Sequence, residues 1–138
     1  MPRIAPLLLA SIVLSSLGCQ PTREAPGIVV GRVVNLDKPI TDANIYFEKV
    51  GDDYSVFAGL QADGSFQLKT HDYGGLPAGS YRIAVRPDPG KRVILVGDNN
   101  QLSHPLIPPQ FMDVNTSGLT ADVKTGENPA FHFDLGKR

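Results

Sequence analysis

Apolar residues that recur at every second position are the feature that most constrains the fold of this chain. The segments 43–48 (ANIYFE) and 79–85 (GSYRIAV) both show this alternation. Because successive side chains of a strand point to opposite faces, the pattern predicts half-buried strands. Segment 28–34 (IVVGRVV) is rich in β-branched residues and predicts another strand.

Turn signals separate these segments at short intervals. Asp63-Gly64 joins the strand-like segments 54–62 and 65–69, and this dipeptide is the strongest hairpin signal in the chain. Two final strands are predicted at 119–123 and 130–135. About seven short strands, with no amphipathic helix of useful length, predict an all-β sandwich.

The segment 87–118 interrupts this pattern. It contains five prolines, and a loop this long in a compact domain is usually functional or disordered. We expect a crossover packed on the surface of the sandwich. Its expected anchors are Leu106, Ile107, Phe111 and Met112. The alternative is a ligand-binding loop.

The first 18 residues differ from everything that follows. Arg3 gives a short positive region, residues 4–14 are almost wholly apolar, and small residues occupy positions 15, 16 and 18. This order is typical of a secretory signal. The apolar run is too short for a permanent membrane-spanning helix. We therefore predict a signal peptide over residues 1–18, cut before Cys19.

Cys19 is the only cysteine in the chain, so it cannot form an internal disulfide after export. The stretch Ser16-Leu17-Gly18-Cys19 resembles the lipobox of bacterial lipoproteins, where the cysteine sulfur receives a diacylglyceryl group. Ser16 and Leu17 stand where the family favours Leu and a small residue, so cleavage by ordinary signal peptidase stays open as an alternative. The resemblance implies lipidation of Cys19, and two or more acyl chains give stable membrane attachment.

The residues after Cys19 form a predicted tether. Residues 19–26 are polar and contain two prolines. Gln20 stands where many inner-membrane lipoproteins carry aspartate. Gln20 therefore favours the outer membrane or the cell surface over the inner membrane.

Several short motifs together resemble carboxypeptidase regulatory-like domains. They are Val29-x-Gly31-x-Val33, Lys38-Pro39-Ile40, Asp63-Gly64-Ser65-Phe66 and Leu76-Pro77-Ala78-Gly79-Ser80-Tyr81. The tail, with Phe131-x-Phe133-x-Leu135, resembles a subgroup of small bacterial lipoproteins built from one such domain. The resemblance implies one domain over residues 27–136. It also implies a seven-stranded Greek-key sandwich with the transthyretin (prealbumin)-like fold, and a non-catalytic role.

No catalytic constellation or metal-ligand spacing is visible in the sequence. His71, His104 and His132 are far apart, and no other ligand lies at a metal-like spacing. Asp52-Asp53 and Asp98-Asn99-Asn100 are predicted to be solvated turn residues, with a loosely bound Ca²⁺ as the less favoured alternative. Collagen-adhesin B-type domains, which share the transthyretin-like fold, often carry an isopeptide bond between an early-strand lysine and a late-strand asparagine, promoted by a buried acid. Asn128 and Glu48 match two of these positions, but the first strand carries Arg32 in place of the lysine.

The sequence thus predicts a non-enzymatic, membrane-anchored envelope lipoprotein that acts as a structural or protein-interaction module. Its expected partners are the lipid bilayer, through acylated Cys19, and an envelope protein or glycan. No cofactor is expected, and the formal net charge of -1 argues against nucleic acid. The alternative is a ligand-binding lipoprotein, for instance one that binds glycans through the 87–118 loop. Its expected exposed rings are Tyr46, Tyr54 and Tyr73.

Overall fold

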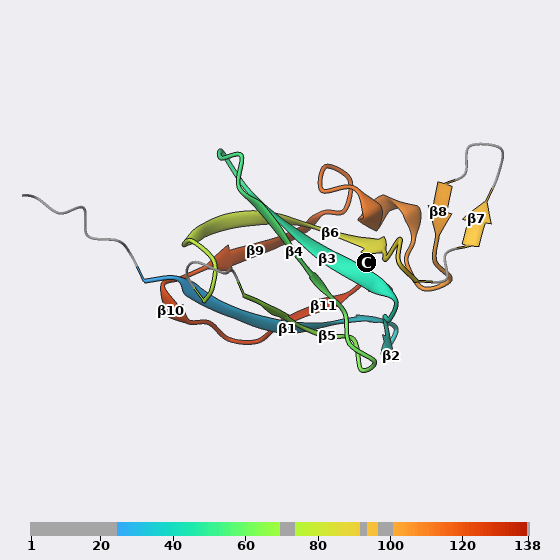
Figure 1. Cartoon of the computed structure of the whole chain (residues 1–138), viewed down its shortest axis with the longest axis horizontal. Coiled ribbons are helices and arrows are strands. Elements are labelled where there is room, and N and C mark those ends of the chain that lie inside the picture. Colours follow the sequence, from blue (N-terminus) through green and yellow to red (C-terminus); the bar gives the residue numbers. More distant parts are fainter. Residues whose placement is uncertain (1–24, 70–73, 92–93, 97–100, 138) are drawn as a thin grey trace, which may run out of the picture.

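The computed structural model describes residues 25–69, 74–91, 94–96 and 101–137. These residues form an all-β fold of eleven strands and one short 3-10 helix, with no α-helix among them (Figure 1). The elements are β1 (Gly27–Asn35), β2 (Lys38–Pro39), β3 (Ala43–Lys49), β4 (Ser55–Gly59), β5 (Ser65–Leu68), β6 (Gly79–Pro87), β7 (Ile94–Val96), β8 (Gln101–Ser103), η1 (Pro109–Met112), β9 (Leu119–Val123), β10 (Gly126–Glu127) and β11 (Phe131–Asp134).

The strands form two main sheets. One is antiparallel with the order β4-β3-β6-β9. In the other, β1 pairs antiparallel with β5 and parallel with β11, while β2 and β10 add short pairings to β1. Figure 1 shows the two sheets as facing layers, and the β7–β8 hairpin projects at one end. Two-layer packing of this kind is the architecture expected of a β-sandwich.

The core lies between the layers and confirms the predicted alternation. Ala43, Ile45 and Phe47 are all buried, as the pattern in 43–48 requires. The Phe47 ring lies 5.9 Å from Phe66 and 5.9 Å from Tyr81, between ring centroids. Phe66 belongs to the β1 sheet and Tyr81 to the opposite sheet. Aromatic contacts therefore join the two layers directly.

Each of the seven segments predicted as strands overlaps one strand of the structure, and β1, β3 and β6 extend one or two residues beyond the predicted ends. Four further strands, β2, β7, β8 and β10, have only two or three residues each. A periodic pattern cannot reveal strands of this length, because two or three residues do not complete enough repeats. The seven strands predicted from the sequence therefore do not include these four short strands.

The predicted hairpin at Asp63-Gly64 is wrong, although the turn is present. The amide of Gly64 donates to the carbonyl oxygen of Gln61 at 2.9 Å, and Gly64 has a φ of 77°, which glycine adopts without strain. The strands on either side, however, pair with different partners, β4 with β3 and β5 with β1. The turn therefore carries the chain from one sheet to the other.

The segment 87–118 is partly regular, because it contains the β7–β8 hairpin and η1. Its predicted anchors are confirmed. Ile107 and Phe111 are buried in the core cluster, and Leu106 and Met112 pack against it. The Asn35 side-chain amide also donates to the carbonyl oxygen of Leu106 at 2.8 Å. Residues 106–112 of this segment are therefore fastened to the sandwich.

Candidate functional site

An aromatic pair of one half-buried and one exposed ring lies on the outer face of the four-stranded sheet. The alternation that buries Phe47 turns Tyr46 outward from β3, directly opposite Phe57 of β4. The two rings stack with centroids 5.3 Å apart and planes 28° apart. The Phe57 residue is 60% exposed, which is high for a large apolar side chain. A single exposed apolar residue on a protein surface needs no explanation. A stacked aromatic pair beside a charged group is different, because its rings are held in one geometry that a ligand or partner can recognise.

Arg86 of β6 supplies that charged neighbour. Its guanidinium carbon lies 4.7 Å from the centroid of the Tyr46 ring, within the range of a cation–π contact. Its Nε donates to the carbonyl oxygen of Met112 at 2.6 Å. Asn44, paired with Arg86 across the strands, lies on the same face and is 8% exposed. We call Asn44, Tyr46, Phe57 and Arg86 the Tyr46 face.

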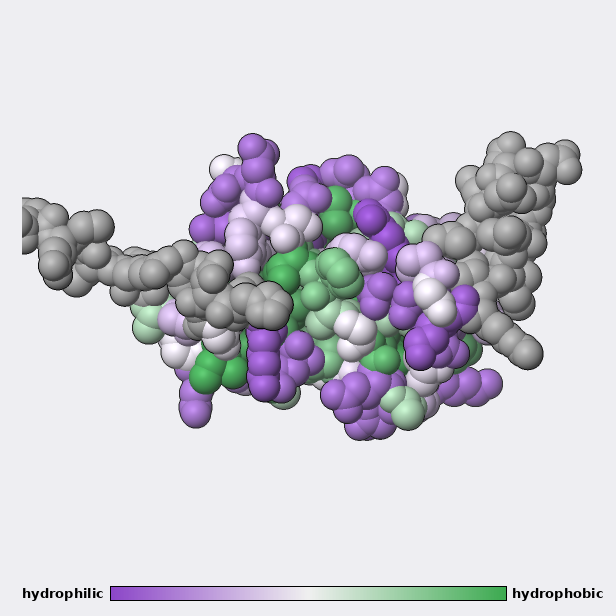
Figure 2. All heavy atoms as spheres, in the orientation of Figure 1, coloured by the Kyte–Doolittle hydropathy of each residue, from purple (hydrophilic) through white to green (hydrophobic). Residues whose placement is uncertain are grey.

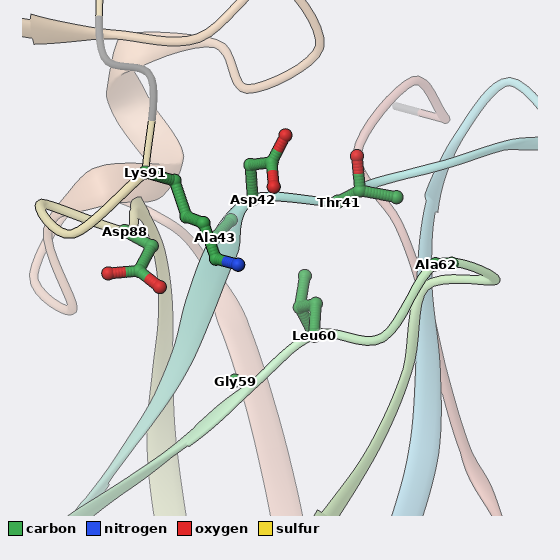
Figure 3. Close-up of a pocket in the computed structure, with 8 residues that line it drawn as sticks. All are labelled: Thr41, Asp42, Ala43, Gly59, Leu60, Ala62, Asp88 and Lys91. Atoms are coloured by element: carbon green, nitrogen blue, oxygen red, sulfur yellow. The ribbon is translucent and has the colours of Figure 1, made fainter.

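A pocket of about 510 Å³ adjoins the Tyr46 face (Figure 3). Gly59 connects the two, because it lines the pocket and pairs with Asn44. The lining residues come from three turns at one end of the sandwich, and they are Thr41, Asp42, Ala43, Gly59, Leu60, Ala62, Asp88 and Lys91. In Figure 3 the charged side chains of Asp88 and Lys91 lie on one side and Leu60 and Ala62 on the other.

Backbone hydrogen bonds fix the charged side of this pocket. The amide of Asp88 donates to the carbonyl oxygen of Asp42 at 2.9 Å, and the Asp88 carboxylate accepts from the amide of Gly90 at 2.9 Å. The amide of Lys91 then donates to the carbonyl oxygen of Asp88 at 3.0 Å, closing a turn. Two carboxylates and one ammonium can hydrogen-bond a polar ligand, and the neighbouring rings can pack against its apolar surface.

Two of the three histidines, His104 and His132, lie in the described part of the chain. His104 Nε2 lies 2.8 Å from the carbonyl oxygen of Thr41, and its Nδ1 accepts from the amide of Leu106. Both ring nitrogens are therefore used, one by the turn before β3 and one within the 87–118 segment. His132 is exposed on β11, as expected. Among the described residues no group of three or more His, Cys, Asp or Glu could hold a metal ion.

Other predicted residues have structural partners. Asn128 accepts from the amide of Lys124 and donates to its carbonyl oxygen, so it closes a turn. Glu48 forms an ion pair with Arg82, and Arg32 donates to the carbonyl oxygen of Asp63. These contacts account for the three residues considered for an isopeptide bond.

The predicted exposed rings have different outcomes. Tyr46 is half-buried, so its ring is less exposed than expected, but it lies on the outer face of the sheet beside Phe57 and Arg86. The expectation for Tyr54 is wrong, because its ring packs against the core and burial raises the pKa of its hydroxyl. Asp52 and Asp53 are exposed turn residues, as expected. Cys19, His71, Tyr73 and residues 98–100 lie outside the described residues.

Comparison with protein-family models, with curated proteins and with solved structures finds no match. The assignment of these residues as a functional site therefore depends on their geometry alone. In the described residues no helix is long and apolar enough to cross a membrane.

Sequence reasoning missed several residues of this site. The only signal for Phe57 is that it falls out of phase with the apolar positions 54, 56, 58 and 60. Arg86, Asp42, Asp88 and Lys91 carry no local signal, because their proximity follows from strand pairing and turns far apart in the chain.

Proposed function

We propose that this protein is a non-catalytic, membrane-anchored envelope lipoprotein that binds another envelope protein through the Tyr46 face. The observation that carries the proposal is the exposed Phe57 ring, which is stacked on Tyr46 beside Arg86. Aromatic residues and arginine are enriched at protein interfaces and at their energetic hot spots. A face that combines both on a rigid sheet suits such a contact.

The face is also preorganised. Arg86 is held by the carbonyl oxygen of Met112, and the segment that contains Met112 is fastened to the core through Phe111. Side chains that are already ordered lose less conformational entropy when a partner binds.

In Figure 2 hydrophobic residues gather in a band across the middle of the view, with hydrophilic residues above and below it.

For the fold, we propose the seven-stranded, transthyretin-like Greek key of the carboxypeptidase regulatory-like domains. The seven longest strands of the two main sheets support this proposal. They divide into the orders β5-β1-β11 and β4-β3-β6-β9, and the chain changes sheet between β4 and β5 and again before β6. The remaining strands are short additions to this frame or lie in the β7–β8 hairpin.

For the anchor, we propose that Cys19 is acylated and inserted in the outer membrane. Strand β1 begins at Gly27. Residues 20–26 therefore span at most about 25 Å when extended. A domain on so short a tether stays close to the bilayer and meets partners that lie near the membrane surface.

Glycan binding is a second candidate, favoured by one observation. The stacked rings of the Tyr46 face adjoin the polar pocket with Asp42, Asp88 and Lys91. Aromatic faces can pack on sugar rings while carboxylates and an ammonium bind hydroxyl groups. Asp88 and Lys91 belong to the 87–118 segment, which is the segment expected to bind ligands in this alternative.

In-cell photocrosslinking tests the two candidates. A photoreactive residue at position 57 should capture one defined envelope protein, and Arg86→Ala should reduce this capture. The matched control is the same probe at His132, an exposed position on β11 in the other sheet. Equal capture from both positions, or none from position 57, contradicts the protein-binding proposal. Thermal stabilisation by a glycan that is lost in Asp88→Asn would favour the second candidate.

A further inference from the structure

A second pocket lies where the 87–118 segment meets the ends of β1 and β11. It has a volume of about 490 Å³. Asn35 and Asp134 contribute polar side chains to its wall, while Pro108, Phe111 and Leu119 contribute apolar ones. None of these residues belongs to the Tyr46 face or to the pocket beside it, so this is a separate site.

Asp134 is the unusual residue of this pocket. Its side chain is only 7% exposed. Oδ1 accepts hydrogen bonds from the backbone amides of Leu36 and Gly136, each at 3.0 Å. Oδ2 is buried and has no hydrogen-bond partner among the described residues. A buried acceptor without a hydrogen-bond partner is costly, and a ligand that donates to it would remove that cost.

The Asp134 carboxylate is negatively charged at neutral pH. The hydrogen bonds from the Leu36 and Gly136 amides lower its pKa below the ordinary value for aspartate. The nearest cation is the ammonium of Lys137, 3.7 Å from Oδ2, on a side chain that is 75% exposed. A separation of 3.7 Å is too long for a hydrogen bond, so Lys137 contributes only a charge interaction. A better-placed cation could therefore displace Lys137.

Two other polar side chains of the pocket, Asn35 and Ser117, already use their hydrogen-bond donors within the protein. Asn35 still offers an acceptor. The Asn35 amide nitrogen already donates to the carbonyl oxygen of Leu106, so its Oδ1 remains an acceptor beside Gly136. The Ser117 hydroxyl donates to the carbonyl oxygen of Ile83 and accepts from the amide of Leu119. Next to Asp134 and Asn35, a ligand that donates hydrogen bonds therefore fits best.

We propose that this pocket binds a primary ammonium group on an aliphatic chain, as in a lysine side chain. The ammonium replaces that of Lys137 at Asp134 Oδ2 and can donate to Asn35 Oδ1. The methylene groups of the ligand pack against Pro108, Phe111 and Leu119, which form the apolar wall. The charge-assisted hydrogen bond to a buried carboxylate is the main source of affinity.

Calorimetric titration of the full chain tests the proposal. Nα-acetyl-lysine methylamide is the probe, and Nα-acetyl-norleucine methylamide is the control, because it keeps the four-carbon chain and lacks the ammonium. The lysine compound should bind, and the norleucine compound should bind at least about tenfold more weakly. Equal affinity for the two compounds overturns the proposal.

Two variants move the affinity in opposite directions. Asp134→Asn removes the charge but keeps an oxygen that can accept from Leu36 and Gly136, and it should weaken lysine binding about tenfold or more. Lys137→Ala removes the competing ammonium and should strengthen binding several-fold. Glu127→Gln, which neutralises an exposed acid on β10, is the matched control and should change nothing.

Lys137→Ala keeps the test decisive if Asp134→Asn fails to fold, because the Lys137 side chain is exposed. If Lys137→Ala binds the lysine compound equally or more weakly, the proposal that the ligand displaces Lys137 from Asp134 is overturned. Cadaverine, titrated in parallel, distinguishes the source of the ammonium. Equal affinity for cadaverine indicates that a free amine suffices, whereas preference for the acetylated lysine indicates a peptide.

Discussion

The hydroxyl of Tyr81 donates a 2.6 Å hydrogen bond to the carbonyl oxygen of Pro77, four residues earlier in the chain. The neighbouring Tyr54 packs edge-on against Tyr81, with ring centroids 6.5 Å apart. The hydroxyl of Tyr54 is buried without a hydrogen-bond partner among the described residues. Two tyrosines in contact therefore differ in whether the hydroxyl is satisfied.

Removing each hydroxyl separately should give opposite results. Tyr81→Phe should lower the free energy of unfolding by about 1 kcal/mol, because it deletes a hydrogen bond and leaves the Pro77 carbonyl without its donor. Tyr54→Phe should leave stability unchanged or raise it, because it removes an unsatisfied buried group. Urea unfolding of both variants measures the difference. Equal losses would contradict the distinction.

The packing of the 87–118 segment predicts a contrast between two phenylalanines. Phe111 is 6% exposed and Phe57 is 60% exposed. Phe111→Ala should therefore cost about 3–5 kcal/mol of unfolding free energy. Phe57→Ala should cost about 1 kcal/mol or less, the size of one exposed aromatic contact. If Phe111→Ala costs no more than Phe57→Ala in urea unfolding, this segment does not anchor the core.

Close backbone contact predicts that Gly31 tolerates no side chain. A Cβ on Gly31 would lie 2.4 Å from the carbonyl oxygen of Phe131 in the paired strand. Gly31→Ala should cost about 1–3 kcal/mol, because β1 and β11 must move apart. Gly59→Ala is the control, since the nearest atom to its Cβ is 3.5 Å away. Its stability should stay within about 0.5 kcal/mol of wild type, and a larger loss would contradict this contact geometry.

The hydrogen bonds of Asp63 predict that its contribution to folding stability is lost at acidic pH. The Ser65 hydroxyl and amide both donate to the Asp63 carboxylate, and these bonds lower its pKa below the ordinary value for aspartate. A lowered pKa stabilises the folded state above the unfolded-state value of about 4. This contribution is lost as the pH falls from there through the folded-state pKa. An NMR titration should therefore show a higher Asp63 pKa in Ser65→Ala than in Ser55→Ala.

Membrane anchoring through Cys19 predicts that the Cys19 sulfur carries a lipid. Cells that express the wild-type chain should incorporate radiolabelled palmitate into it, and Cys19→Ser should remove the label. The chain has no second cysteine to replace Cys19. Equal labelling of the two forms, or no labelling of either, rejects lipidation at Cys19.

The sequence by itself determined where the seven longest strands of the two main sheets form and which side chains of their clearest alternating segments face the core. Segment 43–48 shows this, because the two-residue period is a local property of the backbone and of apolar burial. The anchors Ile107 and Phe111 were likewise predictable, since large apolar residues in a proline-rich loop need a buried place.

Only the tertiary structure decided which strands pair. Gly31 of β1 lies opposite Phe131 of β11, and the turn at Asp63-Gly64 separates two sheets where a hairpin was predicted. Strand order depends on how all the apolar faces pack together, and no local pattern contains that information. The same limit hid the Tyr46 face and the Asp134 pocket, whose residues come from strands and loops far apart in the chain. Pairing of the strands brings these groups together, and their chemistry follows from that proximity.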